Sequence, residues 1–301
     1  MTADPAVIAP PGDWVHRMVA ANGSRFHVAC AGPADGPLVL LLHGFGQFWW
    51  SWRAQIPRLA RAGYRVAAMD LRGYGSSDKT RGRYDLPTLT ADAAGVIRGL
   101  GAANAVVVGH GFGSQIAWSL PSLHPGVARA IVPMSYPHPA SLWSALIRGR
   151  GGVALNFFSF AQTPWLPENR LIAGDLMEFI LTEWSAPGWE PVGVATYQQA
   201  ARIPFVAHSA FQQVRWLTRA RLGGPGRAFL RSLAGPVGVP TLLLHGRADR
   251  FVPSQATANE RERVGAGYKR LLIDDAGHFL PEEAADQVTG ALLRWLPGVT
   301  G

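Results

Sequence analysis

The sequence predicts an α/β protein: a mostly parallel, eight-stranded sheet flanked by helices and interrupted by one helical insertion. Up to residue 138, short apolar stretches that suit buried strands alternate with segments of helical spacing. Residues 139–235 show helical patterns only, and the alternation resumes at residue 236. This order is typical of a parallel sheet with right-handed crossovers, and 301 residues suit one such sheet with one insertion.

The first elements are strands. Residues 14–20 and 26–31 flank Asn22-Gly23, which is a hairpin turn signal. Residues 38–42 form a continuous apolar run, which predicts a strand buried on both faces. The same patterns then predict, in order, a helix over 51–61, a strand over 65–69, a helix over 86–100, a strand over 105–108, a helix over 113–120 and a strand over 130–133.

The second half begins with the insertion. Residues 139–235 contain several prolines and broad apolar helical patterns, and we expect them to form a helical cap over a core domain made of residues 1–138 and 236–301. The core resumes with strands predicted over 241–244 and 269–273, a helix near 254–264 and a closing helix over 282–295.

Composition excludes several classes of protein. Cys30 is the only cysteine, so no intramolecular disulfide and no cysteine-rich zinc site can form. We expect Cys30 to be a small buried strand residue in a reducing, cytoplasmic setting. Residues 1–13 lack the basic start of a signal peptide, and no apolar run is long enough to span a membrane. No metal, phosphate-binding or nucleic-acid motif appears, so the sequence implies no cofactor and no nucleic-acid partner, and it leaves the oligomeric state open.

The net charge is +8, and nearly all of the basic residues are arginines. The ordinary interpretation of the densest group is a solvated helical face and loop. The alternative is weak peripheral contact with an anionic membrane surface or an acidic partner. The group comprises Arg215, Arg219, Arg221, Arg227 and Arg231.

Ligands of open parallel sheets bind beyond the carboxyl ends of the strands, so residues that follow each strand are candidates for a site. His43-Gly44-Phe45 follows the strand over 38–42, and a tight glycine turn there can aim backbone N–H groups into a cleft. The alternative is a plain strand-to-helix turn. The loop over 70–79 lacks the Gly-Lys-Ser/Thr ending of a phosphate-binding loop, and we expect a turn held by ion pairs and glycines.

Residues 109–113, Gly-His-Gly-Phe-Gly, have the pattern of a nucleophile elbow between a strand and a helix. The residue between the outer glycines would be Ser, Cys or Asp, but here it is Gly111, which has no side chain. Ser114 cannot replace it, because Phe112 and Ile116 are not small; we expect its hydroxyl to bond to backbone in the first helical turn.

Two later residues complete the arrangement. Asp249, in a turn after a buried strand, suits the acid that orients a catalytic histidine, and the alternative is that it only caps the turn. His278, in a loop after the last strand, suits the general base, and the alternative is an ordinary surface histidine. The chain order nucleophile, acid, histidine is that of α/β-hydrolases. His138 and His208 are expected to be structural.

Together these motifs resemble the α/β-hydrolase superfamily, and within it the epoxide hydrolases and haloalkane dehalogenases. The resemblance covers most of the sheet, and it rests on the segments 43–53, 70–79, 109–113 and 135–139 and on the Asp249 and His278 turns. It implies the α/β-hydrolase fold. It also implies that Asp249 is the triad acid, that His278 is the general base, and that the N–H groups of Phe45 and Phe112 form an oxyanion hole. The same resemblance suggests a substrate pocket that includes Trp50, His110, Tyr136, Tyr197 and Phe279.

The sequence also departs from that family. Gly111 stands where the family has an attacking aspartate, and Gly46 stands where it usually has proline. The epoxide hydrolases of that family use two cap tyrosines to protonate the epoxide oxygen. The cap here has only Tyr197, and the second tyrosine is missing near Val214-Arg215.

Two functions therefore stay open. One is a weak, non-covalent hydrolase of small apolar substrates, in which Asp249 and His278 activate a water. The other is an inactive relative that binds a small apolar ligand under the cap.

Overall fold

The computed structural model describes residues 5–145 and 153–301; residues 1–4 of the N-terminal segment and 146–152 of the predicted cap lie outside this description. The eight strands form one sheet in the order β1-β2-β4-β3-β5-β6-β7-β8. β1 and β2 form an antiparallel hairpin, β2 is antiparallel to β4, and every other pair is parallel. The predicted eight-stranded, mostly parallel sheet is therefore confirmed. Its strands are β1 Val15–Ala21, β2 Ser24–Ala31, β3 Leu38–Leu42, β4 Arg65–Met69, β5 Ala105–His110, β6 Ala128–Met134, β7 Thr241–Gly246 and β8 Tyr268–Ile273.

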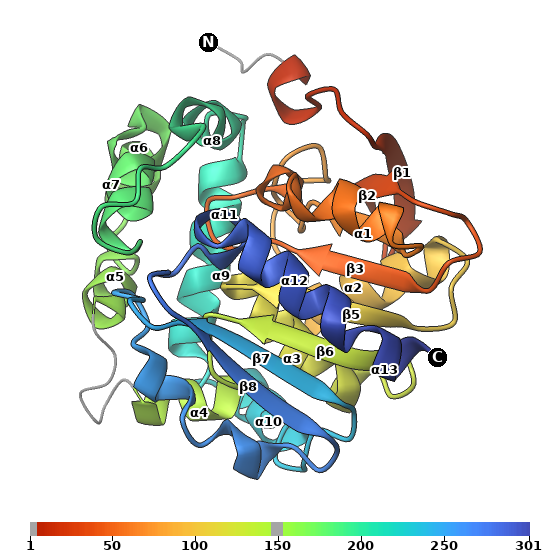
Figure 1. Ribbon diagram of the computed structural model, residues 1–301. Helices are drawn as coiled ribbons and strands as arrows, with labels where there is room; N and C mark the ends of the chain where they lie inside the picture. The colour runs from red at the N-terminus through yellow and green to blue at the C-terminus, as the bar shows by residue number, and fades with distance from the viewer. Residues whose placement is uncertain (1–4, 146–152) are drawn as a thin grey trace.

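Helices cover both faces of the sheet (Figure 1). α1 (Gln55–Arg61) and α12 (Ala285–Trp295) pack together on one face, and α2 (Leu86–Gly99) and α3 (Phe112–Leu123) pack on the other. All residues of β3 and β5 are buried, because each strand lies between two helical layers. Because β3 and β5 are the central strands, their carboxyl ends lie in the middle of the candidate active site.

Between β6 and β7 the chain forms α4 to α10, here called the helical insertion. Figure 1 shows α5, α6, α7 and α9 on the side of the sheet toward which β3 points. These four helices of the insertion therefore lie at the carboxyl ends of the parallel strands. Its helices are α4 Pro139–Ala145, α5 Ala154–Phe160, α6 Leu166–Ala173, α7 Asp175–Glu183, α8 Val194–Ala201, α9 Val206–Arg219 and α10 Gly224–Ser232.

Some predicted helices are shorter than expected. The segment over 51–61 divides into a 3-10 turn, Trp49–Trp52, and α1. The helix predicted near 254–264 is instead two 3-10 turns, Ser254–Thr257 and Glu260–Arg263. The Ser254 carbonyl there accepts hydrogen bonds from the Arg270 guanidinium at 2.5 Å and the Thr257 hydroxyl at 2.9 Å. These two side chains thus occupy the Ser254 carbonyl, which would accept a backbone N–H group if an α-helix continued from this point. The closing helix divides at Ala284 into α11 (Leu280–Glu283) and α12.

The loop after β4 is held by a buried carboxylate, Asp70. It accepts hydrogen bonds from His27 Nδ1 at 2.8 Å, from the Trp49 N–H at 2.8 Å and from the Ser76 N–H at 3.0 Å. The buried ion pair of Arg72 with Asp92, at 2.6 Å, ties the same loop to α2. The segment over 70–79 is therefore a structural turn, as expected. Through the Trp49 N–H, Asp70 also fixes the start of the 3-10 turn Trp49–Trp52.

The arginine group of the insertion is not one solvated face. Arg215 is only 9% exposed and pairs with Glu168 at 2.5 Å, which contradicts the expectation for this residue. Arg219, Arg221, Arg227 and Arg231 are exposed.

Within residues 5–145 and 153–301, no helix has the length and hydropathy needed to cross a membrane.

Candidate active site

The turn from β5 into α3 is tight because three glycines allow it. A β-carbon on Gly109 would lie 2.2 Å from the Gly113 carbonyl oxygen, and one on Gly113 would lie 2.3 Å from the Leu42 carbonyl oxygen. Neither position can hold a larger residue without movement of the backbone. Gly111, at the apex, has φ +53° and ψ −116°, which is a strained conformation for a residue with a side chain.

The apex faces the histidine loop. A β-carbon on Gly111 would lie 3.4 Å from the Gly44 α-carbon and 3.6 Å from His278 Nε2. These are ordinary van der Waals distances, so the space beside the imidazole could accept a small group. Ser114 lies in the first turn of α3, but its buried hydroxyl has no partner in the described chain, so the expected backbone bond is wrong.

Asp249 and His278 meet across the ends of β7 and β8. Asp249 Oδ2 lies 2.9 Å from His278 Nδ1 and 3.2 Å from His245 Nε2, and Oδ1 accepts the N–H groups of Phe251 and Val252. Burial acts to raise the pKa of Asp249, but the imidazoles of His278 and His245 outweigh it and lower the pKa to about 2. The carboxylate is therefore ionised at neutral pH and holds the proton of His278 on Nδ1.

Other contacts fix the backbone around His278. Its N–H donates to the Trp184 carbonyl at 3.0 Å, and its carbonyl accepts from the Ser135 hydroxyl at 2.8 Å and lies 2.7 Å from His110 Nε2. The carboxylate of Glu283 accepts the N–H groups on both sides of the histidine, at 2.7 Å and 2.6 Å. In contrast, His278 Nε2 makes no hydrogen bond with the residues that the structure describes. That nitrogen is free to accept a proton.

Two backbone N–H groups flank the apex. Neither the Phe45 N–H, in the turn after β3, nor the Phe112 N–H, at the start of α3, donates to an acceptor in the described parts of the chain. Both groups are therefore free to donate a hydrogen bond to a molecule bound at the apex. Gly46 has φ +71°, and a β-carbon there would meet the sulfur of Met177 at 2.8 Å. Proline, whose φ is about −65°, could not adopt this turn.

The cavity above the apex is almost closed. Its volume is about 10 Å³, which is close to the minimum for a single water. Trp184 from the insertion stacks on Phe251 with ring centroids 3.6 Å apart, and both side chains fill this space. A larger substrate can enter only if the insertion or its side chains move. The lining residues are Phe45, His110, Phe112, Tyr136, Phe157, Phe158, Trp184, Val214, Phe251, His278 and Phe279.

Comparisons with known proteins identify the family. The family model described as "alpha/beta hydrolase fold" matches residues 37–285. The chain belongs to the α/β-hydrolase fold family. Epoxide hydrolase A of Mycobacterium tuberculosis is 32% identical over 96% of this chain and 99% of its own length. AB hydrolase superfamily protein YfhM of Bacillus subtilis is 31% identical over 93% and 97%. The crystal structure of epoxide hydrolase A from Mycobacterium thermoresistibile matches with a TM-score of 0.80 and 26% identity, over 95% of this chain and 99% of that one.

The structure of this α/β-hydrolase places some predicted pocket residues on the cavity and others away from it. His110, Tyr136 and Phe279 line it. Burial raises the pKa of Tyr136 well above its usual value, so its hydroxyl stays protonated. Trp50 and Tyr197 do not line the cavity; they pack on one another, with ring centroids 5.5 Å apart.

The reason is the turn after β3. It places Trp50 in a separate, partly buried cluster, where the Arg53 guanidinium lies 3.8 Å over its ring and α8 brings Tyr197 against it. The wall is instead formed by Phe157, Phe158 and Trp184, which sequence reasoning missed. The tryptophan content of the insertion was the only available signal. Among the described residues, no group of three or more His, Cys, Asp or Glu side chains is arranged to hold a metal ion.

Proposed function

We propose that this α/β-hydrolase is a weak hydrolase of small apolar epoxides or esters that uses a water in place of a side-chain nucleophile. The observation that carries the proposal is the free Nε2 of His278, which faces the empty apex at Gly111 while Asp249 holds Nδ1 at 2.9 Å. The relatives named as epoxide hydrolases support the substrate class. A core of residues 1–138 and 236–301 under a cap of residues 139–235 is part of this proposal.

The chemistry follows from the geometry. A water beside Gly111 donates a proton to His278 Nε2 and attacks the electrophilic carbon of the substrate. The His278 imidazolium that forms is stabilised by the ionised Asp249. The N–H groups of Phe45 and Phe112 hold the negative charge that develops on the substrate oxygen. With an epoxide, the attack breaks a C–O bond of the ring, and the proton on His278 passes to the released oxygen to give a diol. With an ester, the tetrahedral intermediate expels the alkoxide, which takes the proton from His278 and leaves as the alcohol. Both routes regenerate the neutral base.

This mechanism predicts slow turnover. In a serine hydrolase, loss of the nucleophile reduces turnover by about 10⁶-fold, but roughly 10³-fold acceleration over water survives through the oxyanion hole and binding. The free volume of about 10 Å³ holds no more than one water, so every substrate requires movement of the surrounding side chains, and a small substrate requires the least movement.

The test is a panel of small epoxides and esters assayed with the wild-type chain, His278→Ala and the control His208→Ala. His208 is an exposed histidine of α9, so its loss should leave turnover unchanged. We expect turnover to disappear in His278→Ala only. A single turnover in ¹⁸O-water should label the product at once, because no enzyme oxygen takes part. Turnover that survives in His278→Ala would refute the mechanism.

A second function is favoured by the closed aromatic cavity and the missing nucleophile. In this alternative the protein binds a small apolar ligand and does not transform it. It predicts saturable binding of an apolar probe with the same affinity in wild type and His278→Ala, and no turnover in either. Such a result would replace the hydrolase proposal.

A further inference from the structure

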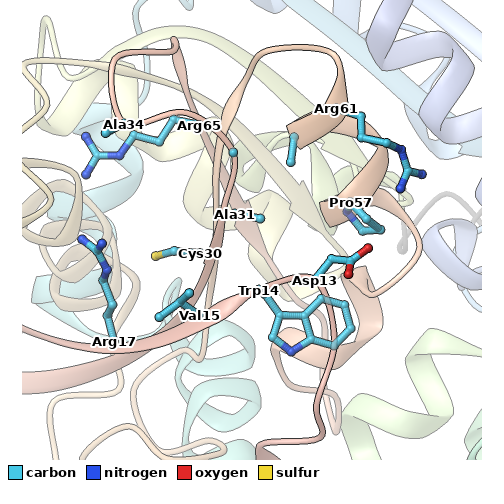
Figure 2. A pocket seen from close by; sticks show the side chains of 12 residues that line it. Asp13, Trp14, Val15, Arg17, Cys30, Ala31, Ala34, Pro57, Arg61 and Arg65 are labelled. Carbon is cyan, nitrogen blue, oxygen red and sulfur yellow. The ribbon is translucent and has the colours of Figure 1, made fainter.

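A second cavity lies at the opposite end of the sheet from the candidate active site. Its volume is about 570 Å³, within the range of pockets that bind small molecules. It is formed by β1, the end of β2, α1 and Arg65 at the start of β4 (Figure 2). The parallel strand β4 ends at the active-site edge, so a pocket at its first residue is remote from the catalytic groups.

Strand register places two arginines beside Cys30. Cys30 pairs with Val15 of β1 and with Ala67 of β4. Arg17 and Arg65 lie two residues from these partners, so all three side chains lie on the same face of the sheet. Figure 2 shows both guanidinium groups on the same side as the Cys30 sulfur. Burial raises the pKa of this thiol, and the charges of Arg17 and Arg65 oppose that rise, which is consistent with their closeness.

The charge of these arginines is not neutralised. Neither Arg17 nor Arg65 forms an ion pair with a carboxylate of the described chain, and Arg65 donates to the Leu100 carbonyl at 2.6 Å. Two guanidinium groups that lack a carboxylate partner and line the same concave site on either side of Cys30 favour an anion, because its oxygens accept their N–H groups and offset their charge. Cys30 is half-buried, not fully buried as expected, so its sulfur can report on this site.

The rest of the pocket is mainly apolar. Val15, Ala31, Pro57 and Ala60 supply aliphatic surface, and Trp14 supplies an aromatic wall. Figure 2 shows Asp13 and Arg61 on the other side of the pocket from Arg17 and Arg65. The cationic end and the apolar wall together suit a ligand with a charged head and an apolar body.

We propose that this pocket binds an amphipathic organic anion, with its carboxylate or phosphate between Arg17 and Arg65 and its apolar chain along Trp14 and Pro57. The two head groups share the chemistry that the arginines recognise. The site is independent of the proposed hydrolase activity, since none of its residues contacts the catalytic groups.

Cys30 provides the test, because it is the only cysteine in the chain. The rate of its alkylation by iodoacetamide is followed by intact mass with octanoate, octyl phosphate or 1-octanol present, each below its micelle concentration. We expect one or both anions to slow alkylation about tenfold at saturation, and octanol to act much less, because charge-assisted hydrogen bonds supply most of the affinity. A comparison of the protection given by octanoate with that given by octyl phosphate shows which of the two head groups the site prefers.

Arg17→Gln should weaken protection by about tenfold in anion concentration, since one charged partner is lost. Arg219→Gln, an exposed arginine of α9, is the matched control and should change nothing. Calorimetric titration of the same three compounds gives a second readout that does not depend on the thiol. Alkylation and heat unaffected by either anion would overturn the proposal, as would equal protection by octanol or full protection in Arg17→Gln.

Discussion

The Nε2 atom of His278 lies 3.6 Å from the place that a β-carbon would occupy on Gly111. The proposed general base therefore faces the position at which a nucleophile elbow carries its nucleophile. The proposed water sits in that space, where the histidine can take its proton.

Gly111→Ala places a methyl group where we propose the water. The contacts would be ordinary, at 3.4 Å to Gly44 and 3.6 Å to His278, so the variant should fold. The φ of +53° makes us expect a loss of about 1 kcal/mol in the free energy of unfolding. Turnover should fall by about 10²-fold or more, because general-base catalysis on the water is lost. A folded variant with wild-type turnover would show that the water lies elsewhere.

Gly111→Asp introduces a nucleophile at the apex. His278 could then activate the water that hydrolyses an alkyl-enzyme ester, and we expect epoxide hydrolysis to rise by roughly 10²-fold or more over wild type, since loss of a nucleophile costs about 10⁶-fold. Mass spectrometry of a Gly111→Asp, His278→Ala double variant should detect the trapped ester. Gly111→Asn, which has the same size without the carboxylate, is the control. No ester in a folded Gly111→Asp protein would argue against epoxide chemistry here.

Asp249→Asn removes the charge that orients His278. The amide leaves the geometry largely intact but favours the wrong imidazole tautomer, because it can donate to Nδ1. We expect kcat to fall by about 10³- to 10⁴-fold, as in related triads. The measurement is kcat on the best substrate of the panel, with circular dichroism to check the fold. A change below tenfold would remove Asp249 from the mechanism.

Trp184→Ala opens the closed cavity. Trp184 stacks on Phe251 at 3.6 Å, and its loss should admit larger substrates or ligands. We expect KM or Kd for a bulky aryl epoxide to decrease, and the free energy of unfolding to decrease by about 3–5 kcal/mol. Trp165→Ala, a tryptophan of the insertion that is 79% exposed, is the control for both measurements. Unchanged selectivity in Trp184→Ala would mean that another group closes the site.

The buried carboxyl group of Glu260 should make the free energy of unfolding depend on pH. Burial raises its pKa from 4.5 to about 7, although hydrogen bonds from Ser141 and the His138 N–H act to lower it. The folded-state pKa of Glu260 is above its unfolded value. The protonated carboxyl group therefore makes its full contribution to the free energy of unfolding below about pH 4.5, and this contribution is lost as pH rises through about 7. The loss amounts to about 3 kcal/mol for a shift of this size.

Glu260→Gln should abolish this dependence, since the amide does not titrate. Urea unfolding of wild type and variant at about pH 5 and about pH 8 measures it, and the difference between the proteins cancels other titrating groups. The variant should gain relative stability at the higher pH. Equal differences at both pH values would contradict the raised pKa.

Much of the fold could be predicted from the sequence alone. The apolar run of β3 and the glycine pattern around Gly111 are local features, because burial on both faces and a tight turn each restrict the residue types at those positions. The sequence also showed that the apex lacks a side chain. Two of the predictions that failed lie where the local pattern was weak. They are the helix over 254–264, which hydrogen bonds from Arg270 and Thr257 interrupt, and the exposure of Arg215.

Only the tertiary structure decided which side chains surround the site and the second pocket. Trp184 and Phe251, from segments far apart in the chain, close the cavity, while Trp50 lies outside it. Register between three strands brings Arg17 and Arg65 to Cys30. These contacts depend on how helices and strands pack against one another, and a residue's own sequence neighbours place no constraint on a partner that lies distant in the chain.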